Sequence, residues 1–377
     1  MIVGEASPLC PWEEAKRGRF AYIATKQTRI SGLDTRKKPV ERLTMKKLMN
    51  EPQAFVDEML EGLLLAYPGR LKSAGGTNRA LVRADAPVAD KVGVVTGGGS
   101  GHLPVFLGYV GRGLASAVAI GNVFSSPTVD QIVAATRGVH SGKGVLYLYG
   151  NYSGDVFNFD TAAEIVDADG IQVETVLVAD DVASAPPERS ANRRGVAGLF
   201  YAYKIAGAKA ESGAALDQVK AAALKAVANC RTMGVGLTPC VVPTVGKPTF
   251  SLADDEMEIG IGIHGEPGIR RGQLLPADEI ATDIVERLVK DFGFQGGEEV
   301  SVLVNGLGAT PPEELYIIYR KVHQILSSRQ VKIYRPYIGE FATSLEMAGC
   351  SITLFKLDDE LKPLLDAPAS SPFFLQV

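Results

Sequence analysis

Short apolar runs without polar alternation recur through the first half of the chain. They lie at Val92–Thr96, Ala115–Gly121, Gly144–Tyr149 and Gln172–Ala179. Strands that are buried on both faces of a sheet have this composition, because neither face meets water. Segments with helical periodicity separate the runs, at Thr128–Arg137 and Phe159–Ala168. The alternation predicts an α/β domain whose sheet is flanked by helices.

A helical spacing of apolar side chains opens this domain. Leu48, Phe55, Met59 and Leu63 predict one helix over Lys46–Leu65. Residues 1–44 differ, since they are rich in Lys and Arg, carry Gly and Pro breaks and sustain no period. We expect residues 1–44 to be a poorly ordered N-terminal extension and place the first domain at residues 45–190.

The composition of the chain changes after a break at Pro186–Ser190. An Ala-rich helical region covers Arg194–Asn229, and its interruption at Glu211–Gly213 predicts a helical hairpin. Strand-like runs then return at Cys240–Pro243, Met257–Ile261, Val300–Val304 and Ser351–Phe355. We predict a second α/β domain over residues 191–345, again a sheet flanked by helices. Residues 346–377 are expected to form a C-terminal strand and a tail that could pack back on the first domain.

Bulk composition excludes several classes of protein. Hydrophobic residues make up 46% and charged residues 22% of the 377 residues, a balance typical of globular domains. The net charge of −4 gives no electrostatic reason to expect nucleic acid or an anionic membrane. No apolar run approaches the roughly 18 residues of a membrane helix, and charged residues at Trp12–Arg17 interrupt any signal-peptide core. The four cysteines show no C-x-x-C spacing, so we expect reduced thiols, no metal site and a cytoplasmic location.

A glycine-rich segment follows the first predicted strand. Thr96–Pro104 reads Thr-Gly-Gly-Gly-Ser-Gly-His-Leu-Pro. Loops at the carboxyl ends of strands are where α/β sheets bind ligands, and glycine lets backbone N–H groups approach a ligand closely. The segment is neither a Walker A loop nor a dinucleotide fingerprint. A tight turn without any ligand explains the glycines equally well, but His102 makes a ligand site the stronger hypothesis.

A second histidine lies in a glycine-rich segment, Gly262–Gly268. A neutral imidazole at His264 can act as a nucleophile toward a carbonyl or as a base, and the surrounding glycines leave the ring open to a substrate. The alternative is a turn histidine that hydrogen-bonds backbone groups.

An acidic side chain opens a predicted helix after the strand that ends at Tyr149. Asp155 could accept a hydrogen bond from a substrate hydroxyl or orient a histidine. Its alternative role is a helix N-cap. The other candidates are weaker: His140 is expected in a surface turn, His323 on a helix, and the pair Asp180–Asp181 in a solvated loop.

Together these segments resemble the dihydroxyacetone-binding subunit of dihydroxyacetone kinases over nearly the whole chain from Met45. The motifs that carry the resemblance are Arg83–Pro87, Gly97–His102, Asn151–Tyr152 with Gly154–Asp155, Arg193–Gly195, Gly246–Pro248, Gly262–Gly268, Asn305 with Leu307–Thr310, and Thr343–Leu345. Each motif is modest alone, and their shared order makes the resemblance specific.

The resemblance implies a mechanism. His264 would add to the ketone carbon and form a hemiaminal, which selects carbonyl substrates over glycerol. His102 and Asp155 would polarise or deprotonate the terminal hydroxyl. Gly99, Ser100, Gly101 and Gly150 would line the substrate pocket with them. A helical partner subunit would carry ATP, or ADP that a phosphotransferase system rephosphorylates, together with Mg²⁺. The ketose subunit itself would be a homodimer.

Three positions depart from the family pattern. Leu103 replaces a Glu, Gly150 an expected Lys and Asn122 an acidic residue. The substitutions either adapt the pocket to a four-carbon or branched ketose, or are neutral changes. A third hypothesis is a dihydroxyacetone sensor that acts with a transcription regulator. The presence of His102 and Asp155 favours the kinase, because a sensor needs the adduct but no proton transfer.

Overall fold

The first sheet holds the apolar runs of the first half of the chain. The computed structural model describes residues 46–377, so the expected N-terminal extension lies outside the described residues. The strands are β1 (Leu71–Ala74), β2 (Thr77–Arg83), β3 (Gly93–Ser100), β4 (Ala117–Val123), β5 (Val145–Gly150) and β6 (Val173–Val178), in the order β1-β2-β4-β3-β5-β6. Strands β3 to β6 pair in parallel, and the β1–β2 hairpin adds to β4 in antiparallel fashion. Because β3 lies between β4 and β5, the strand order reverses at β3.

The second sheet is mostly antiparallel. Its strands are β7 (Cys230–Thr238), β8 (Glu256–Ile259), β9 (Arg270–Gln273), β10 (Glu299–Gly306), β11 (Lys332–Gly339) and β12 (Ala348–Leu357), in the order β11-β10-β12-β7-β8-β9. Among the described strands of this sheet, β10 and β11 pair in parallel and all other neighbours are antiparallel. A short hairpin of β13 (Ala369–Ser370) and β14 (Leu375–Gln376) follows.

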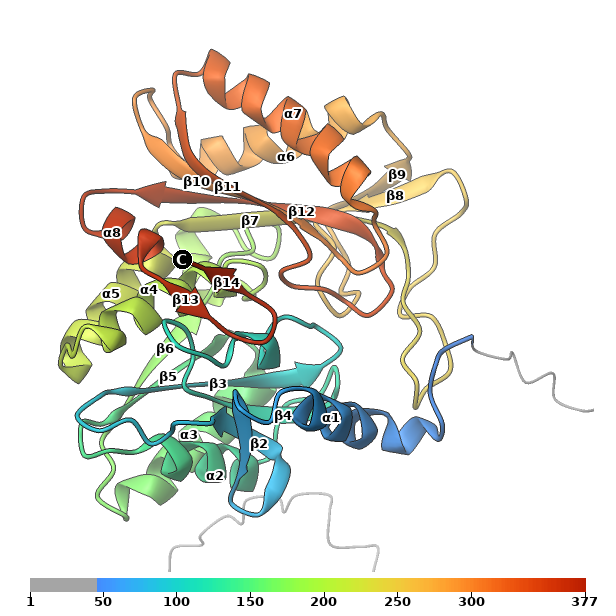
Figure 1. The fold of residues 1–377 in the computed structure, drawn as a ribbon. Helices are drawn as coiled ribbons and strands as arrows, with labels where there is room; N and C mark the ends of the chain where they lie inside the picture. The colour runs from blue at the N-terminus through green and yellow to red at the C-terminus, as the bar shows by residue number, and fades with distance from the viewer. Residues whose placement is uncertain (1–45) are drawn as a thin grey trace, which may run out of the picture. The chain divides into compact units, whose positions relative to one another are not determined.

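Helices form three layers around the two sheets (Figure 1). The helices are α1 (Phe55–Ala66), α2 (Val129–Val139), α3 (Ser153–Asp167), α4 (Leu199–Glu211), α5 (Leu216–Ala228), α6 (Ala277–Phe292), α7 (Pro312–Ser328) and α8 (Leu361–Asp366). Helices α2 and α3 cover the outer face of the first sheet, and α6 and α7 cover that of the second. Helix α4 lies between the sheets, and its tyrosine side chains form hydrogen bonds with a strand of each sheet. The Tyr203 hydroxyl meets Thr96 of β3 at 2.7 Å, and the Tyr201 hydroxyl meets Ser301 of β10 at 2.8 Å.

The predicted fold class is confirmed, because both sheets are flanked by helices. The helical hairpin is also confirmed, as α4 and α5. Two predictions were wrong. The first helix begins at Phe55 rather than Lys46, because Pro52 interrupts the backbone hydrogen bonding and Leu48 is fully exposed. Residues 240–243 lie outside the strands of both sheets, and the strand of this region is β7, which lies earlier in the chain at Cys230–Thr238.

The predicted boundary at residue 345 cuts the second sheet. Strand β12 pairs with β10 on one side and β7 on the other, so it is a central strand of that sheet. Both sheets belong to one compact unit, residues 45–377. The tail beyond β12 reaches the first half of the chain, where the Ser370 N–H donates to the Arg112 carbonyl at 2.9 Å. A linear pattern of apolar runs shows where strands occur but not which strands pair.

Candidate functional site

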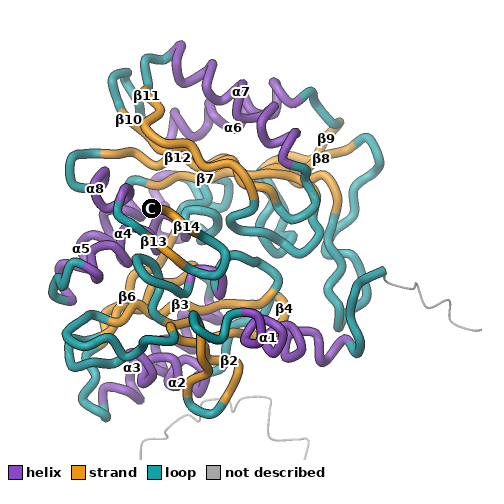
Figure 2. Tube along the Cα trace, viewed as in Figure 1, coloured by secondary structure: helices purple, strands orange, loops and turns teal. Residues whose placement is uncertain are grey.

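The parallel strands of the first sheet bring the candidate residues to one edge. Strand β3 leads into His102, β4 into Phe124, β5 into the turn before Asp155, and β6 into Asp180–Asp181. The carboxyl ends of parallel strands lie at the same edge, and a reversal of strand order opens a crevice there. On the side away from α4 and α5, loop segments fill the space between the sheets (Figure 2). The site is therefore built from loops on two rigid sheets.

His102 is a buried, neutral imidazole with one free nitrogen. Its Nδ1 lies 2.7 Å from the Thr343 carbonyl oxygen. A carbonyl only accepts, so Nδ1 carries the proton and Nε2 keeps its lone pair. Nε2 is buried and has no hydrogen-bond partner among residues 46–377. Burial lowers the pKa of His102 to about 3, and the charge of His264 adds to this effect. The arrangement leaves an unpaired base at the edge of the sheet.

Asp155 lies in the first turn of α3 with one oxygen unpaired. The N-cap of this helix is Tyr152, so Asp155 does not serve as the cap. Its Oδ1 is buried, and no residue in the described part of the chain forms a hydrogen bond with it. Burial raises the pKa of Asp155 to about 6, against the opposing effects of the Ser126 hydroxyl and the charge of His264. A buried carboxyl with this pKa can exchange a proton near neutral pH.

His264 lies in the loop between β8 and β9 and comes from the second sheet. Its Nδ1 is 2.9 Å from Oε1 of Glu266, and its backbone N–H donates to Oε2 of Glu266 at 2.9 Å. Burial opposes the charge of Glu266, but the hydrogen bond and the charge of His264 dominate and hold the pKa of Glu266 at about 2. The ionised carboxylate therefore accepts a hydrogen bond from Nδ1–H, which leaves the lone pair on Nε2 as the reactive site. The predicted alternative, a histidine that only bonds backbone groups, does not describe this ring.

Aromatic rings surround the two histidines, and sequence reasoning missed them as site residues. Phe124 stacks on His102 with ring centroids 4.8 Å apart, and its ring edge meets His264 at 5.3 Å. Tyr152 meets His264 at 4.9 Å. Phe124 has a φ of 56°, which is rare for an aromatic residue and often found at functional sites. The signal for Phe124 was its position directly after a strand end.

The predicted glycine-rich loop is mostly strand. Gly97, Gly98 and Gly99 continue β3, and side chains there would collide with their neighbours. A Cβ on Gly98 would lie 2.2 Å from the Phe106 ring, and one on Gly99 would lie 2.7 Å from the Ser125 nitrogen. The Ser100 hydroxyl donates to the Gly121 carbonyl at 2.8 Å. Close packing thus explains these residues without a ligand, whereas Gly101, with a φ of 101°, makes the turn toward His102.

The three positions that depart from the family pattern have different surroundings. Gly150 faces Tyr152, since a Cβ there would lie 3.1 Å from the Tyr152 ring. Asn122 accepts a hydrogen bond from Arg79 at 3.1 Å in an exposed contact. Leu103 is partly buried against the main core, and its carbonyl accepts a hydrogen bond from Thr343 at 2.9 Å. Of the three, only Gly150 packs against an aromatic ring that touches His264.

Asp180 and Asp181 are buried, so the prediction of a solvated pair was wrong. Asp180 accepts the N–H groups of Val196 and Gly198, both at 2.8 Å, just before α4. Asp181 pairs with Arg194 at 2.7 Å. Burial raises the pKa of Asp181 to about 6, against the opposing charge of Arg194. The sequence around Asp180 and Asp181 does not indicate these partners, because Arg194, Val196 and Gly198 lie in a later segment of the chain.

A loop from the second half of the chain closes the site over His102. The Thr343 N–H donates to the His102 carbonyl at 3.2 Å, and the Leu345 N–H donates to Gly101 at 2.8 Å. Asn305 holds the start of this loop, because its Oδ1 accepts the N–H groups of Phe341 and Ala342, both at 2.8 Å. The Asn305 and Thr343–Leu345 motifs of the sequence therefore fix the position of the His102 ring.

The remaining candidates lie apart from this cluster. His140 is the C-cap of α2, and His323 is on α7, where its Nδ1 meets Ser327 at 3.4 Å. Cys230, Cys240 and Cys350 are buried thiols. Among residues 46–377, no three His, Cys, Asp or Glu side chains gather to hold a metal ion. Within the same range, no helix has the length and apolar character needed to cross a membrane.

Comparison with known proteins identifies the family. Residues 61–373 match the Dak1 domain. The chain is 47% identical over 330 residues to the dihydroxyacetone-binding subunit DhaK of the PTS-dependent dihydroxyacetone kinase 2 of Listeria innocua. This match covers 88% of the chain and 99% of the relative. The chain belongs to the Dak1 family. The resemblance seen in the sequence motifs is thereby confirmed.

Two further relatives show the breadth of this Dak1 family. An L-erythrulose kinase of Pectobacterium atrosepticum is 41% identical over 334 residues, which cover 88% of the chain but only 56% of that relative. The solved structure of the dihydroxyacetone kinase operon co-activator DhaQ is 33% identical, with a TM-score of 0.79 over 87% of the chain and 99% of the co-activator. The same fold thus occurs in kinases and in a co-activator.

Proposed function

We propose that this Dak1 protein is the substrate-binding subunit of a dihydroxyacetone kinase and that it holds a short ketose as a hemiaminal on Nε2 of His264. One observation carries the proposal. Glu266 binds both Nδ1 and the backbone N–H of His264, so the ring is held beside His102 and Tyr152 while its other nitrogen is not used by Glu266. An imidazole that is oriented in this way next to apolar rings is suited to attack a carbonyl carbon through an unprotonated Nε2.

The addition step balances within the site. The Nε2 lone pair forms the C–N bond, the carbonyl π electrons move to oxygen, and that oxygen takes a proton from water. The hydroxide that remains is neutralised by the Nδ1 proton of the imidazolium, which leaves through Glu266, so the product is a neutral hemiaminal. Positive charge that develops on the imidazole ring is stabilised by the Glu266 carboxylate 2.9 Å from Nδ1. Glycerol has no carbonyl, so it cannot form this bond. The adduct therefore selects the substrate by its chemistry rather than by its size.

His102 and Asp155 then act on the terminal hydroxyl. Each has a buried atom, Nε2 of His102 and Oδ1 of Asp155, that lacks a hydrogen-bond partner within the residues that the structure describes. A substrate hydroxyl that donates to one of these atoms removes an unpaired polar group from the protein interior. When the hydroxyl oxygen attacks phosphorus, its proton passes to that acceptor. Fixing the hydroxyl through the covalent adduct adds the benefit of proximity.

The phosphoryl donor comes from a partner subunit in this proposal. The Listeria relative is named as one subunit of a PTS-dependent kinase, and the chain spans about half of the longer L-erythrulose kinase. A helical partner would carry ATP, or ADP rephosphorylated by a phosphotransferase system, with Mg²⁺. We also propose that the ketose subunit is a homodimer.

A crystal of the protein soaked in dihydroxyacetone tests the proposal. Continuous density from Nε2 of His264 to the ketone carbon is expected, and a crystal soaked in glycerol should show no such bond. Bound dihydroxyacetone that lies free of His264 at full occupancy would contradict the proposal. The variant His323→Asn is a matched control, because His323 lies on α7 and makes no contact with the site.

Two relatives support alternative functions. Similarity to the L-erythrulose kinase supports a four-carbon ketose as substrate, and similarity to DhaQ supports a sensor that acts with a transcription regulator. Activity toward dihydroxyacetone and L-erythrulose with the partner subunit separates the two substrates. A neighbouring reading frame for a helical nucleotide-binding subunit favours the kinase, whereas a regulator alone favours the sensor.

A further inference from the structure

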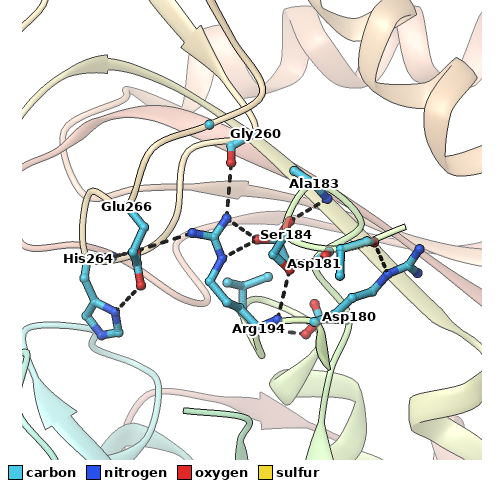
Figure 3. Close-up of polar contacts among 12 residues, drawn as sticks. Asp180, Asp181, Ala183, Ser184, Arg194, Gly260, His264 and Glu266 are labelled. Atoms are coloured by element: carbon cyan, nitrogen blue, oxygen red, sulfur yellow. Dashed lines mark hydrogen bonds and ion pairs between the residues drawn. The ribbon is translucent and has the colours of Figure 1, made fainter. Parts of the chain in front are cut away.

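Two adjacent arginines, the first buried and the second partly buried, precede α4 and have different partners. Arg193 pairs with Asp291 of α6, where its Nη1 lies 3.0 Å from Oδ1, so it stabilises packing away from the site. The Arg194 side chain lies against the loop that carries Glu266 and His264 (Figure 3). Its Nε and Nη2 lie 2.9 and 2.7 Å from Oδ2 of Asp181. The proposed reaction so far uses neither arginine.

Arg194 lies directly behind the carboxylate that holds His264. Its Nη1 is 3.8 Å from Oε2 of Glu266, the oxygen that also accepts the His264 backbone N–H. Its Nη2 donates to the Gly260 carbonyl at 3.3 Å at the start of the same loop. Figure 3 shows the resulting order of contacts, from Asp181 through Arg194 to Glu266 and His264.

Gly262 provides the space for this arrangement. A Cβ at Gly262 would lie 2.1 Å from Oε2 of Glu266 and 2.4 Å from Nη1 of Arg194. Any other residue there would push the two charged groups apart. The Gly262 backbone N–H donates to the Glu266 carbonyl at 2.9 Å, so the loop also closes tightly at this point.

We propose that Arg194, held in place by Asp181, is a positioning residue that fixes the Glu266 carboxylate and through it the ring of His264. The Glu266 side chain is 32% exposed, so without a fixed cation beside it water competes for its oxygens. Arg194 is itself only 15% exposed and Asp181 4%, so the cation is anchored in the protein rather than in solvent. This inference rests on the proposed adduct at His264.

The loss of Arg194 should weaken adduct formation through Glu266 alone. The variant Arg194→Gln should bind dihydroxyacetone about fivefold more weakly, the upper end of what a partly exposed ion pair contributes. The same substitution in a Glu266→Gln background should cause no further loss, because the two residues act in series. Affinity is measured by calorimetry, and the adduct by the carbon resonance of dihydroxyacetone labelled at C2.

Controls separate positioning from stability. The variant Arg193→Gln removes a neighbouring buried ion pair and should lower stability while leaving the affinity for dihydroxyacetone unchanged. If Arg194→Gln does not fold, Asp181→Asn tests the same claim, and its loss of affinity should also vanish in the Glu266→Gln background. Wild-type affinity in Arg194→Gln or Asp181→Asn, or fully additive losses, would overturn the inference. Failure of the wild-type protein to form an adduct would instead overturn the proposed function.

Discussion

The imidazole rings of His102 and His264 lie 4.9 Å apart at an interplanar angle of 74°. Each ring has its Nδ1 bound to a fixed acceptor, the Thr343 carbonyl for His102 and the Glu266 carboxylate for His264. Both rings therefore keep Nε2 available, one as a buried base and the other as a nucleophile beside it. The two rings come from different sheets, so the relationship exists only in the folded protein.

Replacing the proposed proton acceptors should reduce turnover more than binding. With the partner subunit and its nucleotide present, His102→Asn and Asp155→Asn should each lower kcat by about 10²- to 10⁴-fold, the usual contribution of a general base. Occupancy of the His264 adduct should persist in crystals of both variants, because neither residue makes the covalent bond. An unchanged kcat would assign both residues to structural roles. Loss of the adduct in His102→Asn would mean that His102 assists the addition step.

The variant Asp155→Asn should also make the free protein more stable above pH 6. The pKa of Asp155 is raised to about 6 in the folded protein, so the folded state favours the protonated carboxyl. Its contribution to stability is complete below the unfolded pKa of about 3.9 and is lost as the pH rises through 6. At pH 8 the variant removes the free-energy cost of burying the ionised Asp155 carboxylate, which is at most about 3 kcal/mol.

Chemical denaturation at pH 8 and at pH 4 measures this effect. The stabilisation by Asp155→Asn should be present at pH 8 and largely lost at pH 4, where the Asp155 side chain of the folded protein is protonated. A variant that is equally or less stable than the wild type at pH 8 would show that the carboxylate is not penalised by burial.

Part of this site is predictable from the sequence. The strands of the first sheet are visible as apolar runs, and His102, His264 and Asp155 follow strand ends in glycine-rich segments. The contact of Arg194 with Glu266 could not be predicted from the sequence, because it joins two distant segments that are brought together by the packing of both sheets. The central position of β12 in the second sheet could not be predicted from the sequence for the same reason. Burial of Asp181 likewise depends on a partner that the local sequence does not indicate.

Phe124 should restrict the size of the ketose. Its ring stacks on His102 and meets His264 edge-on, so Phe124→Ala opens space next to the nucleophile. The ratio of kcat/KM for L-erythrulose to that for dihydroxyacetone should rise about tenfold, an effect typical of small changes in an apolar pocket. Phe294→Ala is a matched control, since Phe294 stacks on Phe292 beyond the end of α6 and should leave the ratio unchanged. An unchanged ratio in Phe124→Ala would mean that the ring does not limit the substrate.

The covalent bond to His264 is tested most directly by the carbon resonance of dihydroxyacetone labelled with ¹³C at C2. With the wild-type protein, the signal of bound ligand should move from the carbonyl region to that of a tetrahedral carbon bonded to nitrogen and oxygen. With His264→Ala no such signal should appear, whereas His323→Asn should behave like the wild type. A bound ligand whose C2 remains in the carbonyl region in the wild-type protein, or a tetrahedral signal that persists in His264→Ala, would contradict the account.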